Sequence, residues 1–175
     1  MQVVVLILAA LQIAQTTTPP PPVPATARGD RFQIAVPQGW RILTAGSDVV
    51  IEHSSGASLL VLRTDPVKNL PEYALQQAER VMTPLGFAKL GEPRTFKETH
   101  EEWIEYEIRG NRLAAHRRIL YRAMRRDSAF YSIVYEAGED QYESLLTDAQ
   151  GIASSVQAVI QAPPARRAPV RRVAR

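Results

Sequence analysis

Apolar and polar residues alternate through residues 100–137, and this period-two pattern predicts three consecutive antiparallel strands. The pattern fits strands because successive side chains along a strand point to opposite faces of the sheet. One face of this meander would be apolar, and the other would carry charged side chains. We expect the rest of the domain to pack against it.

The first turn of the meander is expected at Gly110-Asn111, because both residue types tolerate the positive φ of a two-residue hairpin turn. Counting outward from that turn sets the register of the first two strands, and an acidic strand then faces a basic one. The pairs expected on the charged face are Glu105 with His116 and Trp103 with Arg118.

A second turn is expected at Arg126-Asp127. It would place Val134 beside Ile119 on the apolar face and Glu136 beside Arg117. A charged arginine on an apolar face is costly unless it is paired, so we expect Arg117 and Glu136 to form an ion pair.

The remaining pattern predicts a strand, a Pro-Gln-Gly-Trp turn, a hairpin, a helix, a short strand and a closing helix. The apolar run 59–62 indicates a central strand covered on both faces, and so layers above and below the sheet. The expected ranges are 32–36, 37–40, 49–53 with 58–64, 69–85, 94–97 and 140–156.

Capping signals mark the start of both helices. Asn69 with Glu72 predicts the first start, and Asp140 with Glu143 predicts the second, because a short polar side chain can accept from the free backbone N–H groups there.

Both ends of the chain differ in composition from its middle. Residues 1–14 are apolar and resemble the core of a secretory signal peptide, and residues 15–29 are a proline-rich stretch expected to be a disordered linker. The folded domain is expected over residues 30–161, followed by an arginine-rich tail over residues 162–175. Export to the periplasm or the extracellular space follows, and the absence of cysteine excludes a lipid anchor on that residue.

The tail explains the net charge. Removing its five arginines from the formal charge of +3 leaves −2 for the rest, so the domain itself is not basic. We expect the tail to be disordered and to attract anionic surfaces or nucleic acid weakly, since such attraction depends on charge alone. The candidate polyanion contacts are Arg166, Arg167, Arg171, Arg172 and Arg175.

We find no catalytic motif in the sequence, and it predicts no catalytic, cofactor-binding or metal-ligating residue. His53 and Ser55 adjoin at an expected hairpin turn, where a solvated turn explains them. The charged face of the meander is the candidate partner surface, with an arginine stacked on tryptophan as its anchor. Its residues are Trp103, Glu105, His116, Arg118 and Arg122.

The order of these elements resembles that of PsbP/Mog1-like domains over residues 32–157. The resemblance implies an α+β fold in which an antiparallel sheet of about six strands lies between helices on both faces. It also implies a non-enzymatic role as an accessory or binding factor. The residues that carry it are Phe32, Ile34, Val36, Pro37, Gly39, Trp40, the meander from Glu102 to Tyr135, Tyr142, Ile152 and Val156.

Three functions from different classes are compatible with the sequence. The first is an exported monomeric domain, without enzymatic activity, that binds a protein or an envelope component. The second is a carrier of a small molecule or a metal, in which His116 would be a ligand. The third is a binder of polyanions that works through the tail.

Overall fold

The computed structural model describes residues 24–159 of the 175-residue chain. The expected leader, most of the proline-rich linker and the arginine-rich tail lie outside the described residues. The helices and strands, in chain order, are β1 (Ala25–Gly29), β2 (Phe32–Val36), β3 (Trp40–Ala45), β4 (Asp48–His53), β5 (Ser58–Thr64), α1 (Leu70–Met82), β6 (Gly86–Leu90), β7 (Arg94–Lys97), β8 (Glu101–Arg112), β9 (Ala115–Arg126), β10 (Ala129–Gly138), α2 (Tyr142–Ser154) and β11 (Gln157–Ala158).

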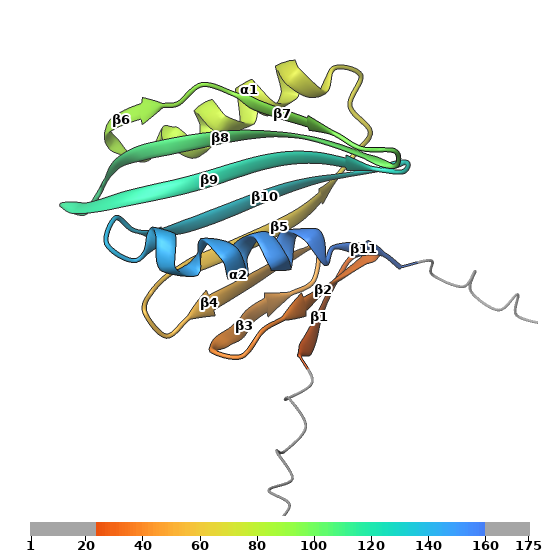
Figure 1. Ribbon diagram of the computed structural model, residues 1–175, viewed down its shortest axis with the longest axis horizontal. Helices are drawn as coiled ribbons and strands as arrows, with labels where there is room; N and C mark the ends of the chain where they lie inside the picture. The colour runs from red at the N-terminus through yellow and green to blue at the C-terminus, as the bar shows by residue number, and fades with distance from the viewer. Residues whose placement is uncertain (1–23, 160–175) are drawn as a thin grey trace, which may run out of the picture.

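An eight-stranded antiparallel sheet forms the centre of the fold, in the order β3-β4-β5-β10-β9-β8-β6, and β7 pairs with β8 beside β6. A smaller sheet, β1-β2-β11, packs at one side of it (Figure 1). The α+β class and the antiparallel sheet are confirmed. The expectation of about six strands is wrong, because the described residues hold eleven strands in two sheets.

The two helices lie on opposite faces of the large sheet (Figure 1). On one face, α1 packs its buried Ala74 and Ala78 against a cluster that contains Ile108 and Tyr121. On the other face, α2 and the small sheet cover a second and larger cluster of apolar residues. Strand β5 carries fully buried side chains at Leu59 and Val61 on one face, and Leu60 and Leu62 on the other face are partly buried, so the predicted covering of both faces is confirmed in part.

The two helix starts differ in how they are capped. The Asn69 side chain accepts a hydrogen bond from the backbone N–H of Glu72 at 3.2 Å, so the predicted cap of α1 is confirmed. The predicted cap of α2 is wrong, because Gln141 occupies the capping position and makes no side-chain cap bond. Packing of α2 on the sheet stabilises its position in place of a cap.

The register of the β8–β9 hairpin differs from the expected one. The chain turns at Leu113-Ala114, and Gly110 lies inside the strand opposite Arg117. A Cβ atom on Gly110 would lie 2.9 Å from the Leu85 Cβ and 3.2 Å from the Gly86 carbonyl oxygen. This glycine therefore allows the close approach of β6 and does not form the turn.

The register error of the hairpin leaves the predicted faces intact, because it amounts to six residues, an even number. Tyr106 lies opposite Tyr121 and Ile108 opposite Ile119, all on the apolar face toward α1. The individual pairs predicted for the charged face are wrong. Glu105 pairs with Arg122 and not with His116, and Trp103 pairs with Met124.

The turn between β9 and β10 lies at Asp127-Ser128, one residue beyond the expected turn. Val134 accordingly pairs with Tyr121 and not with Ile119. The predicted contact between Arg117 and Glu136 is nevertheless confirmed, because the Arg117 Nε donates to a Glu136 carboxylate oxygen at 3.0 Å from a diagonal position.

Several elements were not predicted. Strand β1 begins at Ala25, inside the stretch 15–29 expected to be a disordered linker, and Ala27 is buried opposite Ile34. The expected domain start at Asp30 is thus too late. Strand β3 follows directly from Trp40, and β6 occupies part of the stretch between α1 and β7.

Candidate functional site

The charged side chains of β8 and β9 form a series of ion pairs, which we call the ion-pair strip. It arises because the observed register sets glutamates of β8 opposite or diagonal to arginines of β9. The separations between a guanidinium nitrogen and a carboxylate oxygen run from 2.6 to 2.9 Å. The pairs are Glu101–Arg126, Glu102–Arg125, Glu105–Arg122 and Glu107–Arg118.

The Glu105–Arg122 pair is the buried part of the strip, with side chains only 3% and 8% exposed. Arg122 donates twice to one Glu105 oxygen, at 2.9 and 2.6 Å, and Arg94 approaches the other oxygen at 3.1 Å. The Arg122 guanidinium also lies 5.3 Å from the centre of the Trp103 ring, which stacks on Phe96. Contacts with Arg94 and Trp103 therefore fix the positions of the two charged side chains.

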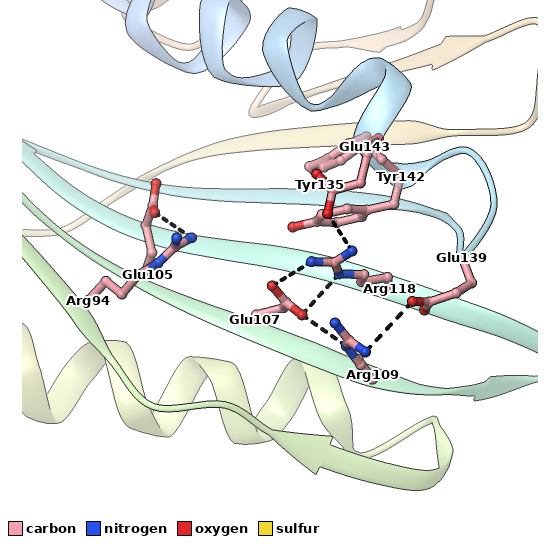
Figure 2. A network of polar contacts seen from close by, with 9 residues as sticks. All are labelled: Arg94, Glu105, Glu107, Arg109, Arg118, Tyr135, Glu139, Tyr142 and Glu143. Atoms are coloured by element: carbon pink, nitrogen blue, oxygen red, sulfur yellow. Dashed lines mark hydrogen bonds and ion pairs between the residues drawn. The ribbon is translucent and has the colours of Figure 1, made fainter.

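Arg118 joins the strip to α2 (Figure 2). It donates two hydrogen bonds of 2.9 Å to Glu107 and one of 2.6 Å to Glu143, and it lies 4.1 Å from the centre of the Tyr142 ring. The bonds from Arg118 lower the pKa of Glu107, and the bonds to Glu107 raise the pKa of Arg118. Burial raises the pKa of Tyr135, which also borders this network, to about 12.

The five residues predicted as a partner surface do not form an exposed patch. Glu105 and Arg122 are buried, and Trp103 and Arg118 are partly covered. The arginine on the Trp103 ring is Arg122, where the sequence predicted Arg118. His116 is exposed, but its Nδ1 lies 2.8 Å from the Asn111 side-chain oxygen and not near Glu105.

This arrangement does not favour the alternative function of a metal carrier in which His116 would be a ligand, because His116 does not lie beside a glutamate of β8. Within residues 24–159, no group of three or more His, Asp or Glu side chains converges where a metal could bind. At the β4–β5 turn, the His53 Nδ1 lies 2.9 Å from the Ser55 hydroxyl and accepts from the Ser55 backbone N–H at 3.2 Å. These bonds stabilise an exposed turn.

A second region lies at one end of the sheet, where the β8–β9 turn projects beside the start of β6 (Figure 1). We call it the hairpin end. Leu113 at the turn is 98% exposed and Phe87 in β6 is 93% exposed. The two are close in the sheet, because Gly86 pairs with Asn111, two residues before Leu113.

The backbone of the hairpin end is unusual for the residues it carries. Leu113 and Ala114 have φ of 49° and 67°, and Phe87 has φ of 51° within a bulge between Gly86 and Lys89. The left-handed region suits glycine or asparagine, and other side chains adopt it at a cost of roughly 1–2 kcal/mol. Such strain in exposed apolar residues is a feature of functional sites.

A basic depression adjoins Phe87. It has a volume of about 300 Å³, and a second depression of about 340 Å³ shares its Lys89 and Arg109 walls. Lys89 has no ion-pair partner among the described residues, and it lies directly opposite Arg109 in the sheet. The first depression is lined by Phe87, Lys89, Arg109, Gly110, Asn111, His116, Arg117 and Glu139.

Two arginines at the hairpin end share one acid. Arg112 and Arg117 each donate to Glu136 at 3.0 Å, which leaves one positive charge unbalanced in that group. Arg109 bonds to Glu107 at 2.9 Å and lies 3.8 Å from Glu139. The hairpin end therefore combines exposed apolar side chains with an excess of positive charge.

Sequence reasoning missed Phe87, Lys89 and Leu113. The Gly110-Asn111 signal moved the expected turn away from Leu113, and the segment after α1 has no clear periodicity. The only available signal was an apolar residue beside an expected turn, as at Leu113. Such a residue can be either exposed or buried, so the signal does not identify a site.

The fold of the chain is of the PsbP/Mog1 type. Three solved structures are similar to it: cyanobacterial PsbP (CyanoP) from Synechocystis, at 17% identity and a TM-score of 0.51 over 74% of this chain and 87% of that one; LpqN of Mycobacterium tuberculosis, at 14% and 0.55 over 74% and 83%; and the Ran-binding protein Mog1p of Saccharomyces cerevisiae, at 12% and 0.53 over 74% and 90%.

These identities establish similarity of fold and not of function. No protein-family model and no curated protein matches the sequence. LpqN is described as involved in cell envelope biogenesis, and Mog1p as a binding protein for Ran. In the part of the chain that the structure describes, no helix is both long and apolar enough to cross a membrane.

Proposed function

We propose that this protein is an exported, non-enzymatic accessory domain that binds a protein or another component of the cell envelope. The observation that carries the proposal is the hairpin end, where Phe87 and Leu113 are almost fully exposed in strained backbone conformations. Exposed apolar surface marks sites of interaction with a protein, a membrane or a ligand.

The ion-pair strip supports a binding role in a different way. Its charged groups are bonded to one another, so the strip stiffens β8 and β9 beneath the hairpin end and offers little free chemistry. A rigid support favours binding, because less conformational entropy is lost when a partner is bound. The likeness in fold to LpqN and Mog1p is compatible with the proposal.

The apolar leader supports export. The sequence alone leaves the start of the mature chain open between Ala14 and Arg28. The buried Ala27 in β1 moves the later limit to a position before β1, because removal of β1 would expose part of the core. We expect the mature chain to begin between residues 14 and 24. Cell fractionation with N-terminal sequencing tests this directly, and an intact Met1 on a cytoplasmic protein would reject export.

Binding is tested by affinity capture from envelope extracts with the purified full chain. A double variant, Phe87→Asn with Leu113→Asn, should lose the captured component, because asparagine tolerates the same backbone but removes the apolar surface. Leu43→Asn is the matched control, since Leu43 is half-exposed on β3 at the other edge of the sheet. Hydrolysis of generic ester or phosphoester substrates, without any captured partner, would contradict the proposal.

A further inference from the structure

On the basis of the proposed binding function, we infer that the partner of the hairpin end is an anionic lipid surface. Phe87 and Leu113 would enter the apolar boundary of the bilayer, and the neighbouring basic side chains would face the lipid phosphates. The structural observation is the combination of two outward-pointing apolar side chains with a basic surround on one projecting end of the sheet.

The shape of the hairpin end favours a deformable apolar medium over a peptide ligand. A peptide with an apolar anchor requires a concave apolar pocket, whereas here the apolar side chains project into solvent from a turn and a bulge. The depressions beside them are lined mainly by polar and charged residues. A lipid surface accepts projecting apolar side chains without a preformed pocket.

The charges of the hairpin end favour an anionic surface. Its basic side chains are Lys89, Arg109, Arg112 and Arg117, and the acids beside them are Glu107, Glu136 and Glu139. Glu107 is also bonded to Arg118 of the strip, and Lys89 carries no ion pair among the described residues. Lys89 and Arg109 are also directly opposite across β6 and β8, which is unfavourable for like charges unless an anion lies near them. Arg109 already bonds to Glu107 at 2.9 Å and lies 3.8 Å from Glu139, so Lys89 is the cation that is left for a lipid phosphate.

The positions of these groups match the depths at which they would act. Leu113 lies at the turn and Phe87 lies next to the Gly86–Asn111 pair, and Lys89 and Arg109 form the next pair further inward along β6 and β8. An aromatic and an aliphatic side chain at the boundary, with basic groups behind them, is the arrangement of a peripheral contact with anionic lipid.

The inference is tested by measuring whether the side chain at position 87 enters the bilayer. In Phe87→Trp, the new indole should become accessible to quenching by brominated acyl chains in vesicles of equal parts phosphatidylcholine and phosphatidylglycerol. The fluorescence of the parent chain, in which Trp40 is buried and Trp103 half-buried, provides the background. No quenching above that background would overturn the inference.

Affinity for the same vesicles gives a second measurement. Phe87→Asn with Leu113→Asn should weaken binding by at least about tenfold, and Lys89→Gln by a smaller factor. Leu43→Asn and Lys97→Gln are the matched controls, because both sites are exposed and lie outside the hairpin end. Equal losses in the hairpin-end variants and the controls would overturn the inference.

The arginine-rich tail requires a separate arm, because it is itself expected to attract anionic lipid. The experiment is therefore repeated on the full chain with its five tail arginines changed to glutamine. Quenching at position 87 should persist there, and quenching that depends on the tail arginines would place the contact on the tail and overturn the inference.

The outcomes separate the lipid contact from binding in general. If position 87 is not quenched while the double asparagine variant still loses a component captured from envelope extracts, the lipid assignment fails and the binding function stands. If neither effect is observed, both are rejected.

Discussion

The ion-pair strip and the hairpin end share strands β8 and β9, but they differ in how far their charged side chains are paired and their apolar side chains are buried. In the strip, Glu105 and Arg122 are buried and bonded to each other. At the hairpin end, Leu113 is exposed and strained, and Lys89 is free of ion pairs among the described residues. The strip is thus a bonded and partly buried segment, and the hairpin end beside it is exposed and strained. This combination is expected where a rigid support carries a contact site.

The largest effect should come from breaking the buried pair of the strip. Glu105→Ala would leave Arg122 buried without an acidic partner and should reduce the free energy of unfolding by about 3–5 kcal/mol. Chemical denaturation measures the loss. Glu102→Ala is the control, because its partner Arg125 is half-exposed, and it should cost less than about 1 kcal/mol.

A hydrophobic replacement of both partners sharpens this test. Glu105→Leu with Arg122→Met should recover much of the loss, since no buried charge remains. If Glu105→Ala costs no more than Glu102→Ala, the strip does not contribute to stability as its burial indicates.

A smaller effect is expected where the strip approaches the hairpin end. Glu136→Ala would leave the partly buried Arg117 unpaired and should cost about 1.5–3 kcal/mol, the range for hydrogen bonds to charged groups. The charge exchange Arg117→Glu with Glu136→Arg should recover part of this. It is best made together with Arg112→Ala, because Arg112 also bonds to Glu136 and would repel an arginine there. Strictly additive effects would contradict the contact.

The layers of the fold were predictable from the sequence because they depend on which face each side chain occupies. The alternation around Tyr106 and Ile108 is unaffected by a register error of an even number of residues, so the apolar and charged faces were assigned correctly. The capping signal at Asn69 and the apolar run of β5 are likewise local properties of the sequence.

The register and the candidate site were not predictable for a physical reason. Gly110 is required by the close approach of β6, which is a contact between residues distant in sequence, and it imitates a local turn signal. Leu113 and Ala114 form the real turn although neither residue type favours positive φ. Pairs such as Glu105 with Arg122 depend on that register, so an error in the turn displaced every one of them.

A substitution at the hairpin end should stabilise the protein, whereas the substitutions of Glu105 and Glu136 should destabilise it. Leu113→Gly should raise the free energy of unfolding by about 1 kcal/mol, because glycine adopts a φ of 49° without the steric cost that leucine bears there. Thermal denaturation at constant protein concentration measures the change. Leu43→Gly is the control, because Leu43, at the bulge of β3, does not have a positive φ, and glycine should lower stability there by roughly 0.5–1 kcal/mol.

A decrease in stability for Leu113→Gly would contradict the assignment of strain to the turn. An increase, together with weaker vesicle binding by the Leu113→Asn variants, would show that the hairpin end trades stability for a contact.

The smallest effect should appear in the dependence of stability on pH. The folded-state pKa of Glu107 lies below its ordinary value of 4.5, mainly because Arg118 donates hydrogen bonds to it. The folded protein therefore binds fewer protons at this site than the unfolded chain. The resulting stabilisation is complete above the unfolded pKa and is lost as the pH falls through the lower folded pKa.

Glu107→Gln removes this ionised group at every pH and should lower stability near neutral pH by less than about 1 kcal/mol, since the side chain is partly exposed to solvent. The difference between the variant and the parent should then vanish in acid, as the parent carboxylate becomes protonated. Urea denaturation from pH 7 down to the acid limit of the fold measures it, with Glu98→Gln as a control for a general loss of negative charge. A difference that stays constant into acid would mean that Arg118 is held by its contacts with Tyr142 and Glu143, and that the charge of Glu107 adds nothing to the support beneath the hairpin end.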